Sequence, residues 1–129
     1  NPSSVAQKAA EAAYTGSQEC IEEMRVAFER RRNLIVELLS EIPGLRINNP
    51  QGAFYIFPEV SSYFGKKNGE EVIKDSHDLS MYLLEEAHVA TVEGAAFCAP
   101  DYIRLSYATS DENIKEAVAR IKVALAKLK

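Results

Sequence analysis

A strand that carries one arginine is predicted near the C-terminal end of the chain. Apolar and polar residues alternate between positions 102 and 107, so that Ile103, Leu105 and Tyr107 share one face of a half-buried strand. Arg104 lies on the opposite face. The pattern therefore predicts an arginine that is held on a rigid element, opposite a face that enters the core.

Four stretches are predicted to form helices. An alanine-rich stretch begins at Ser4, its expected N-cap, and Thr15-Gly16-Ser17 should weaken or bend it, because an interior glycine costs about 1 kcal/mol relative to alanine. The other three stretches have an apolar stripe at spacings of three, four and seven residues. We expect Ser76 and the capping box Thr109–Glu112 to start the last two. The stripe residues are Ile21, Met24, Phe28, Ile35, Leu38, Leu39 and Ile42, then Leu79, Leu83 and Ala87, then Ile114, Val118, Ile121, Leu125 and Leu128.

A hairpin is predicted in the centre of the chain. Leu45–Asn48 is a short strand candidate, Gly52–Phe57 has the pattern of a second strand, and the residues between them are typical of a tight turn. The stretch 59–74 is polar and is expected to be a surface loop of variable conformation. Val89–Val92 is expected to form a further strand.

This order of elements predicts an α+β fold. We expect a small antiparallel or mixed sheet with helices packed mainly on one face. With 129 residues, of which 47% are hydrophobic, the chain has the size and composition of a single domain with a hydrophobic core. Helices on one face would leave the other face, which carries Arg104, for a ligand or a second domain.

Charge and cysteine content narrow the classes of function. The net charge of -4 argues against a general nucleic-acid binder, and Arg30-Arg31-Arg32 is expected to form a solvated helix face. No apolar run approaches the roughly 18 residues of a membrane-spanning helix. Cys20 and Cys98 are far apart, and His77 and His88 have no neighbouring ligand set, so neither a redox motif nor a metal site is predicted. We therefore expect a soluble, cytoplasmic protein without nucleic-acid or membrane partners.

Arg104 is the candidate binding residue. A guanidinium group is a planar fork of donors, which matches a carboxylate or a phosphate through two parallel hydrogen bonds. The alternative is an arginine that is solvated or that forms a surface ion pair worth about 0–1 kcal/mol. The strand pattern by itself leaves both interpretations open.

Four segments of the chain form a family pattern. They are Asn1–Gln7 (NPSSVAQ), Pro50–Tyr55 (PQGAFY), Val89–Phe97 (VATVEGAAF) and Tyr102–Ala108 (YIRLSYA). In this order they resemble the C-terminal small domain of the fold-type I, pyridoxal-phosphate-dependent aminotransferases. The likeness is greatest to the aspartate aminotransferase group of the class I and II enzymes, and it extends over essentially the whole chain.

The resemblance implies roles for two residues. Arg104 matches the family arginine that holds the substrate α-carboxylate, and Phe54 matches an aromatic residue that lies near the substrate. An ordinary core aromatic is the alternative for Phe54. Tyr55 and Phe97 are interpreted as packing residues and are left out of the site. Where the family often has Phe-Gly, this chain has Phe97-Cys98.

The resemblance also implies a larger enzyme. In the family a lysine binds pyridoxal phosphate, whereas the lysines here fall on polar loops or outward helix faces. A large domain upstream of Asn1 would therefore bind the cofactor, residues 1–16 would form a helical segment between the domains, and this piece alone would be inactive and would not bind the cofactor covalently. The full-length protein would be a homodimer that transfers an amino group between an amino acid, with aspartate as one candidate, and a 2-oxo acid. The alternative is a stand-alone α+β module that binds a ligand or partner without catalysis.

Overall fold

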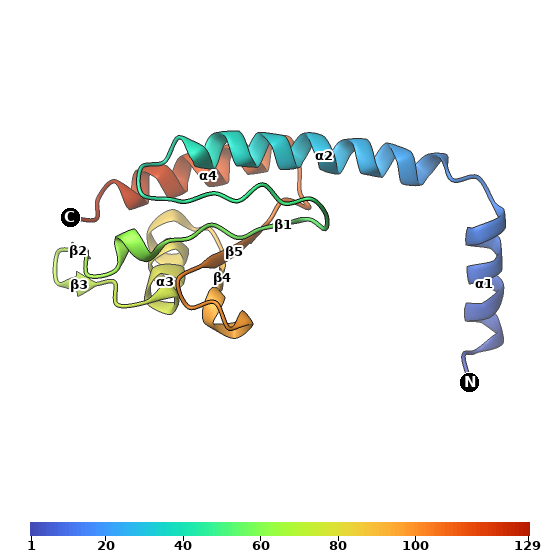
Figure 1. Ribbon diagram of the computed structural model, residues 1–129, viewed down its shortest axis with the longest axis horizontal. Coiled ribbons are helices and arrows are strands. Elements are labelled where there is room, and N and C mark those ends of the chain that lie inside the picture. Colours follow the sequence, from blue (N-terminus) through green and yellow to red (C-terminus); the bar gives the residue numbers. More distant parts are fainter.

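Helices and a small sheet enclose one hydrophobic core in the computed structural model, which describes residues 1–129 (Figure 1). The predicted α+β class is confirmed. The helices are α1 (Ser4–Thr15), α2 (Glu19–Ser40), α3 (Ser76–Ala87) and α4 (Asp111–Leu125), with short 3-10 turns η1 (Ser61–Tyr63) and η2 (Gly94–Phe97). The strands are β1 (Tyr55–Ile56), β2 (Lys67–Asn68), β3 (Glu71–Val72), β4 (Val92–Glu93) and β5 (Ile103–Ser106).

The strand with Arg104 is the centre of a three-stranded antiparallel sheet. Its order is β1-β5-β4, and β2 and β3 form a separate hairpin. Tyr55 pairs with Ser106 on one side of β5, and Val92 pairs with Arg104 on the other. Residues that face each other in an antiparallel pair share a face of the sheet, so Tyr55, Val92 and Arg104 lie together on the face that points away from the core.

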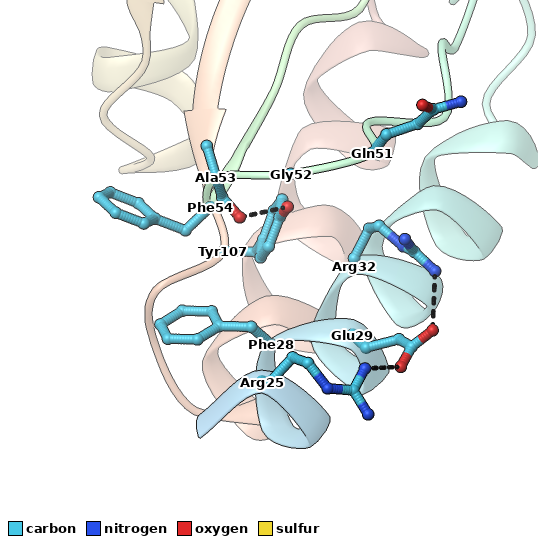
Figure 2. A pocket seen from close by; sticks show the side chains of 9 residues that line it. All are labelled: Arg25, Phe28, Glu29, Arg32, Gln51, Gly52, Ala53, Phe54 and Tyr107. Atoms are coloured by element: carbon cyan, nitrogen blue, oxygen red, sulfur yellow. Dashed lines mark hydrogen bonds and ion pairs between the residues drawn. The ribbon is translucent and has the colours of Figure 1, made fainter. Parts of the chain in front are cut away.

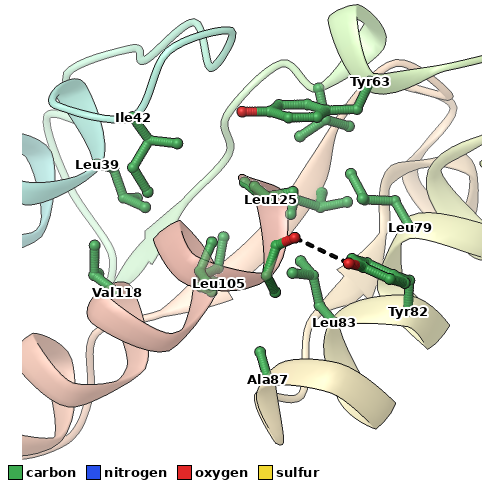
Figure 3. Close-up of a cluster of buried hydrophobic side chains, with 14 of the residues drawn as sticks. Leu39, Ile42, Tyr63, Leu79, Tyr82, Leu83, Ala87, Leu105, Val118 and Leu125 are labelled. Carbon is green, nitrogen blue, oxygen red and sulfur yellow. Dashed lines mark hydrogen bonds between the residues drawn. The ribbon is translucent and has the colours of Figure 1, made fainter. Parts of the chain in front are cut away.

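The other face of the sheet packs against the helices, as the alternation in β5 predicted. Ile103, Leu105 and Tyr107 are buried, and they join apolar residues of α2, α3 and α4 in a cluster of 20 side chains. Figure 3 shows how Tyr82 of α3 points at α4, where its hydroxyl donates to the carbonyl of Ala124 at 2.9 Å. This hydrogen bond satisfies the one polar group that Tyr82 brings into the core.

The N-terminal region projects away from the core. Helix α1 has no buried residue and lies apart from the other elements, at the far end of α2 (Figure 1). At Thr15-Gly16-Ser17, where a weakening or bend is predicted, the helix ends: α1 stops at Thr15 and Gly16 is its C-cap. The predicted stripe of α2 is correct only in its C-terminal half, since Ile21 and Met24 are each 53% exposed. No helix combines the length and the apolar character that a membrane span requires.

The predicted hairpin is wrong. Arg46 forms an isolated antiparallel bridge with Glu59, and β1 pairs with β5, which is distant in sequence. The physical reason is the core, because Ile56 is fully buried and shares the inner face of the sheet with its partner Leu105. The turn residues near β1 cannot reveal that it pairs with β5, because this pairing depends on the core.

The stretch 59–74 also differs from the prediction. It contains η1 and the β2-β3 hairpin, and it places Val60, Tyr63 and Ile73 in the core with at most 2% of their surface exposed. These three apolar residues lie too far apart in a polar stretch to form the regular apolar spacing that would have predicted a helix or a strand. A surface loop was therefore the wrong interpretation.

The helix caps lie one residue from their predicted positions. The N-cap of α1 is Ser3 and not Ser4, and the N-cap of α3 is Asp75 and not Ser76. Each cap side chain accepts a hydrogen bond from a backbone N–H in the first turn of its helix. At α4 the cap is Ser110, whose hydroxyl accepts from the backbone N–H of Asn113. Ser76 is instead the first residue of α3, and it is buried. Each region contains two adjacent capping residues, and the pattern does not distinguish between them.

Candidate functional site

Arg104 lies over two aromatic rings on the outer face of the sheet. The Cζ atom of Arg104 is 4.4 Å from the centroid of the Tyr55 ring and 4.4 Å from the centroid of the Phe97 ring. Tyr55 comes from β1 and Phe97 from the end of η2, so two segments far apart in sequence meet at this guanidinium. Arg104 is partly buried by these contacts.

The charge of Arg104 has no partner within the chain. Eleven ion pairs are present, and all of them involve other residues. A surface ion pair, one of the two alternatives raised by the sequence, is therefore not what the structure contains. A guanidinium that contacts aromatic rings keeps its charge, and N–H groups without an ion-pair partner remain able to donate to an anion.

Phe54, the second predicted residue, lies beside this cluster. Its ring is 4.5 Å from that of Tyr55 and 6.1 Å from that of Phe28. The side chain is 40% exposed, so Phe54 is not an ordinary core aromatic. The structure thus brings the two predicted site residues together through Tyr55, which contacts both.

Phe54 also borders a hollow of about 440 Å³ between α2 and the loop that precedes β1 (Figure 2). Figure 2 shows Phe28 of α2 and Phe54 of the loop on the same side of Tyr107. The lining residues are Arg25, Phe28, Glu29, Arg32, Gln51, Gly52, Ala53, Phe54 and Tyr107. Arg104 is not among them, so the hollow and the guanidinium are neighbouring features that share the aromatic residues of segment 54–55.

Tyr107 fixes the loop that positions Phe54. Its hydroxyl donates to the carbonyl of Ala53 at 3.0 Å (Figure 2). Its backbone N–H donates to the carbonyl of Phe54 at 2.9 Å. Ala53 has a φ of 59°, a left-handed conformation that is costly for a residue with a Cβ atom. These two hydrogen bonds help to hold it there. The alternation of β5 placed Tyr107 in the core, but it gave no signal for this second role.

The charges around the hollow neutralise one another. Glu29 pairs with Arg25 at 2.9 Å and with Arg32 at 3.5 Å. Hydrogen bonds to Glu22 and Glu29 raise the pKa of Arg25 above its ordinary value, and the bond to Arg25 lowers the pKa of Glu22. Because these arginines are already paired, Arg104 is the better candidate for binding an anion.

No lysine of the chain lies in a buried setting, and no cluster of metal-ligating side chains is present. None of its eight lysines is buried, and Lys8, Lys122 and Lys127 form ion pairs with exposed glutamates. A lysine that attacks a carbonyl needs a lowered pKa, which arises in a desolvated or cationic setting. No group of three or more histidine, cysteine, aspartate or glutamate residues could hold a metal.

Comparison with known proteins identifies the family. The family model described as aminotransferase class I and II matches residues 1–121. The chain belongs to this family. A probable aspartate/prephenate aminotransferase of Aquifex aeolicus is 52% identical over 84% of the chain, and an aspartate/prephenate aminotransferase of Cereibacter sphaeroides is 46% identical over 99% of it. The chain spans only 26% and 32% of the length of these two aminotransferases.

Solved structures of aminotransferases share the fold of the chain. The aspartate aminotransferase of Rhizobium meliloti matches 99% of the chain with a TM-score of 0.94 and 43% identity. The alanine aminotransferase of Pyrococcus furiosus matches 97% with a TM-score of 0.85 and 31% identity. The chain covers 32% and 30% of these two structures. The resemblance of the four sequence segments is thus confirmed at the level of the family and of the fold.

Proposed function

We propose that this chain is the substrate-carboxylate-binding small domain of a pyridoxal-phosphate-dependent aminotransferase. The longer protein would transfer an amino group between an amino acid and a 2-oxo acid. One observation carries the proposal: in a member of the aminotransferase family, an arginine without an ion-pair partner lies on the outer face of the sheet, over two aromatic rings.

Arg104 is proposed to bind the α-carboxylate of the substrate through two parallel hydrogen bonds. Such a contact orients the substrate, and positioning of this kind lowers the barrier to reaction by several kcal/mol. Phe54 is proposed to contact the bound substrate from the edge of the neighbouring hollow. Its ring is 4.5 Å from that of Tyr55 and is 40% exposed, so it is available to a ligand.

A large domain of the same chain is proposed to supply the cofactor site, because no lysine of residues 1–129 is buried. The apolar side chains that α1 and the start of α2 expose support this proposal, since exposed apolar residues on adjoining helices are typical of a surface that another domain covers. Residues 1–16 would then form a helical segment between the two domains. The exposed side chains are Val5, Tyr14, Ile21, Met24 and Val26.

Aspartate is the first amino donor to test. The names of several relatives, including those of Geobacillus stearothermophilus and Bacillus subtilis, are aspartate aminotransferase. A homodimer in the cytoplasm is proposed for the full-length protein.

The test is substitution of Arg104 in the full-length protein. Arg104→Ala is expected to reduce kcat/KM for aspartate by about 100-fold or more, because a charge-assisted bidentate contact is lost. Arg104→Lys keeps the positive charge but not the planar fork, and is expected to lose about tenfold. Steady-state kinetics with a panel of amino donors would measure both effects.

Arg46→Ala is a matched control, because Arg46 is an exposed arginine 3.6 Å from Glu59 and lies outside the site. It should leave kcat/KM unchanged. Binding of pyridoxal phosphate, measured by absorbance, should be nearly the same in all three variants. If kcat/KM of Arg104→Ala equals that of the unmodified protein, the proposed role of Arg104 is wrong.

A further inference from the structure

The two rings that contact Arg104 are themselves held in place. Tyr55 belongs to β1, which pairs with β5, and its ring contacts Phe54 at 4.5 Å. Phe97 ends η2, and the Phe57 ring meets it edge-on at 6.1 Å. Phe57 in turn stacks on Tyr102, with the ring centroids 5.2 Å apart. Each ring over the guanidinium is thus braced by another aromatic residue.

These contacts restrict a side chain that would otherwise be mobile. An arginine on an exposed sheet face loses rotamer freedom when it binds a ligand, and that loss reduces affinity. Rings that hold the guanidinium before a ligand arrives reduce that loss. Both ring centroids lie 4.4 Å from the Cζ atom of Arg104, and its N–H groups, which have no ion-pair partner in the chain, remain able to donate.

We infer that Tyr55 and Phe97 are positioning residues, which hold the Arg104 guanidinium in the orientation that binds the substrate carboxylate. They act through Arg104 and not by touching the carboxylate. The inference rests on the proposed function, because it assigns the rings a role in binding the same carboxylate. It departs from the interpretation of both side chains as packing residues.

The first experiment uses the full-length protein and tests whether positions 55 and 97 need an aromatic ring or only an apolar side chain. Tyr55→Leu and Phe97→Leu should each raise KM for aspartate about tenfold and change kcat much less. Tyr55→Phe and Phe97→Tyr keep a ring and should restore KM to nearly the original value. Phe64→Leu is the matched control, because Phe64 packs beside the core and contacts no arginine. Equal KM values for the leucine variants and the unmodified protein would overturn the inference.

A second experiment avoids large changes of shape. Phenylalanine analogues with one, two or three fluorine atoms at position 97 keep the ring but weaken the negative charge on its face. KM for aspartate should rise stepwise with the number of fluorine atoms, whereas the melting temperature should change little. A KM that does not depend on fluorination would show that the ring acts by packing alone.

A double-mutant cycle separates this inference from the proposed function. In an Arg104→Ala background, Tyr55→Leu and Phe97→Leu should produce no further rise in KM, because the group that they position is gone. A further rise of the same size would overturn the positioning role. An Arg104→Ala variant with normal kcat/KM would instead reject the proposed function, which is a different result.

Discussion

Three buried tyrosines join distant segments of the chain through their hydroxyl groups. Tyr63 donates to the carbonyl of Pro43, Tyr82 to that of Ala124, and Tyr107 to that of Ala53. Burial raises the pKa of all three phenols above the ordinary value of about 10, and the carboxylate of Glu86 adds to the rise at Tyr82. These residues therefore make the stability of the fold sensitive to alkaline pH.

The free energy of unfolding is expected to be constant with respect to these groups below pH 10 and to fall as the pH rises further. The folded state keeps the phenolic protons that the unfolded state loses, so each tyrosine contributes a slope of about -1.4 kcal/mol per pH unit between its unfolded and folded pKa values. Urea denaturation from pH 8 to pH 11 would measure this slope. Tyr82→Phe should cost about 1 kcal/mol at pH 8 and should make the fall less steep.

Tyr14→Phe is the control for this measurement, because Tyr14 is 86% exposed and forms no hydrogen bond through its hydroxyl. It should change neither the stability at pH 8 nor the slope. A stability that stays flat up to pH 11 in the unmodified chain would contradict the role assigned to the buried phenols.

For single residues, the sequence predicted which face of a strand each side chain lies on, but not which other side chains it contacts. The alternation of β5 correctly placed Ile103, Leu105 and Tyr107 in the core and Arg104 outside it. It could not show that the guanidinium of Arg104 lies over Phe97. The position of that ring depends on how η2 folds against the sheet, and no regular spacing in the sequence records this.

Among the elements, η2 depends on a close approach of backbone atoms at Gly94. The N–H of Gly94 donates to the carbonyl of Tyr102 at 2.8 Å, and its carbonyl accepts from Ala99 at 3.0 Å. A Cβ atom at this position would overlap both the Ala99 and the Tyr102 carbonyl oxygens. Because η2 carries Phe97, the same glycine determines where that ring lies.

Gly94→Ala is expected to destabilise the protein by about 1–3 kcal/mol, since the backbone must move to admit the methyl group. The same shift should displace Phe97 and weaken aspartate binding. Gly52→Ala is the matched control, because a Cβ atom there would meet nothing within 4 Å. Urea denaturation of both variants would test the prediction, and equal stabilities would contradict it.

Pairings between elements were the least predictable part of the fold. The sequence identified α3, α4 and β5 because each has a clear period. It did not reveal that β1 pairs with β5, since the two segments are about 50 residues apart in sequence and are brought together by the shared burial of Ile56 and Leu105. Periodicity describes one element at a time, whereas pairing depends on the core that the elements build together.

The molecule as a whole consists of a packed core region and a helical N-terminal region that is exposed. The core lies where the sheet, α3, α4 and the end of α2 meet, whereas α1 and the first turns of α2 contribute no buried residue. The chain spans about a third or less of the length of its aminotransferase relatives. The binding of the cofactor is accordingly proposed for another part of the protein.

The isolated chain is expected not to bind pyridoxal phosphate covalently at a defined lysine. Incubation with the cofactor, reduction with borohydride and mass spectrometry should show only partial and scattered labelling of exposed lysines. The full-length protein should show one fully labelled lysine outside residues 1–129, and it is the control. Stoichiometric labelling of a single lysine in the isolated chain would contradict the division of roles proposed above.

The long arm of α2 has a geometric consequence. About 27 Å of helix separate Leu39, which is buried in the core, from Ile21 near the exposed end, at 1.5 Å per residue. A tilt of the core by about 5° therefore displaces Ile21 by about 2 Å, provided that the helix stays straight. A small rotation of the core would thus become a translation of about 2 Å at the exposed end of α2.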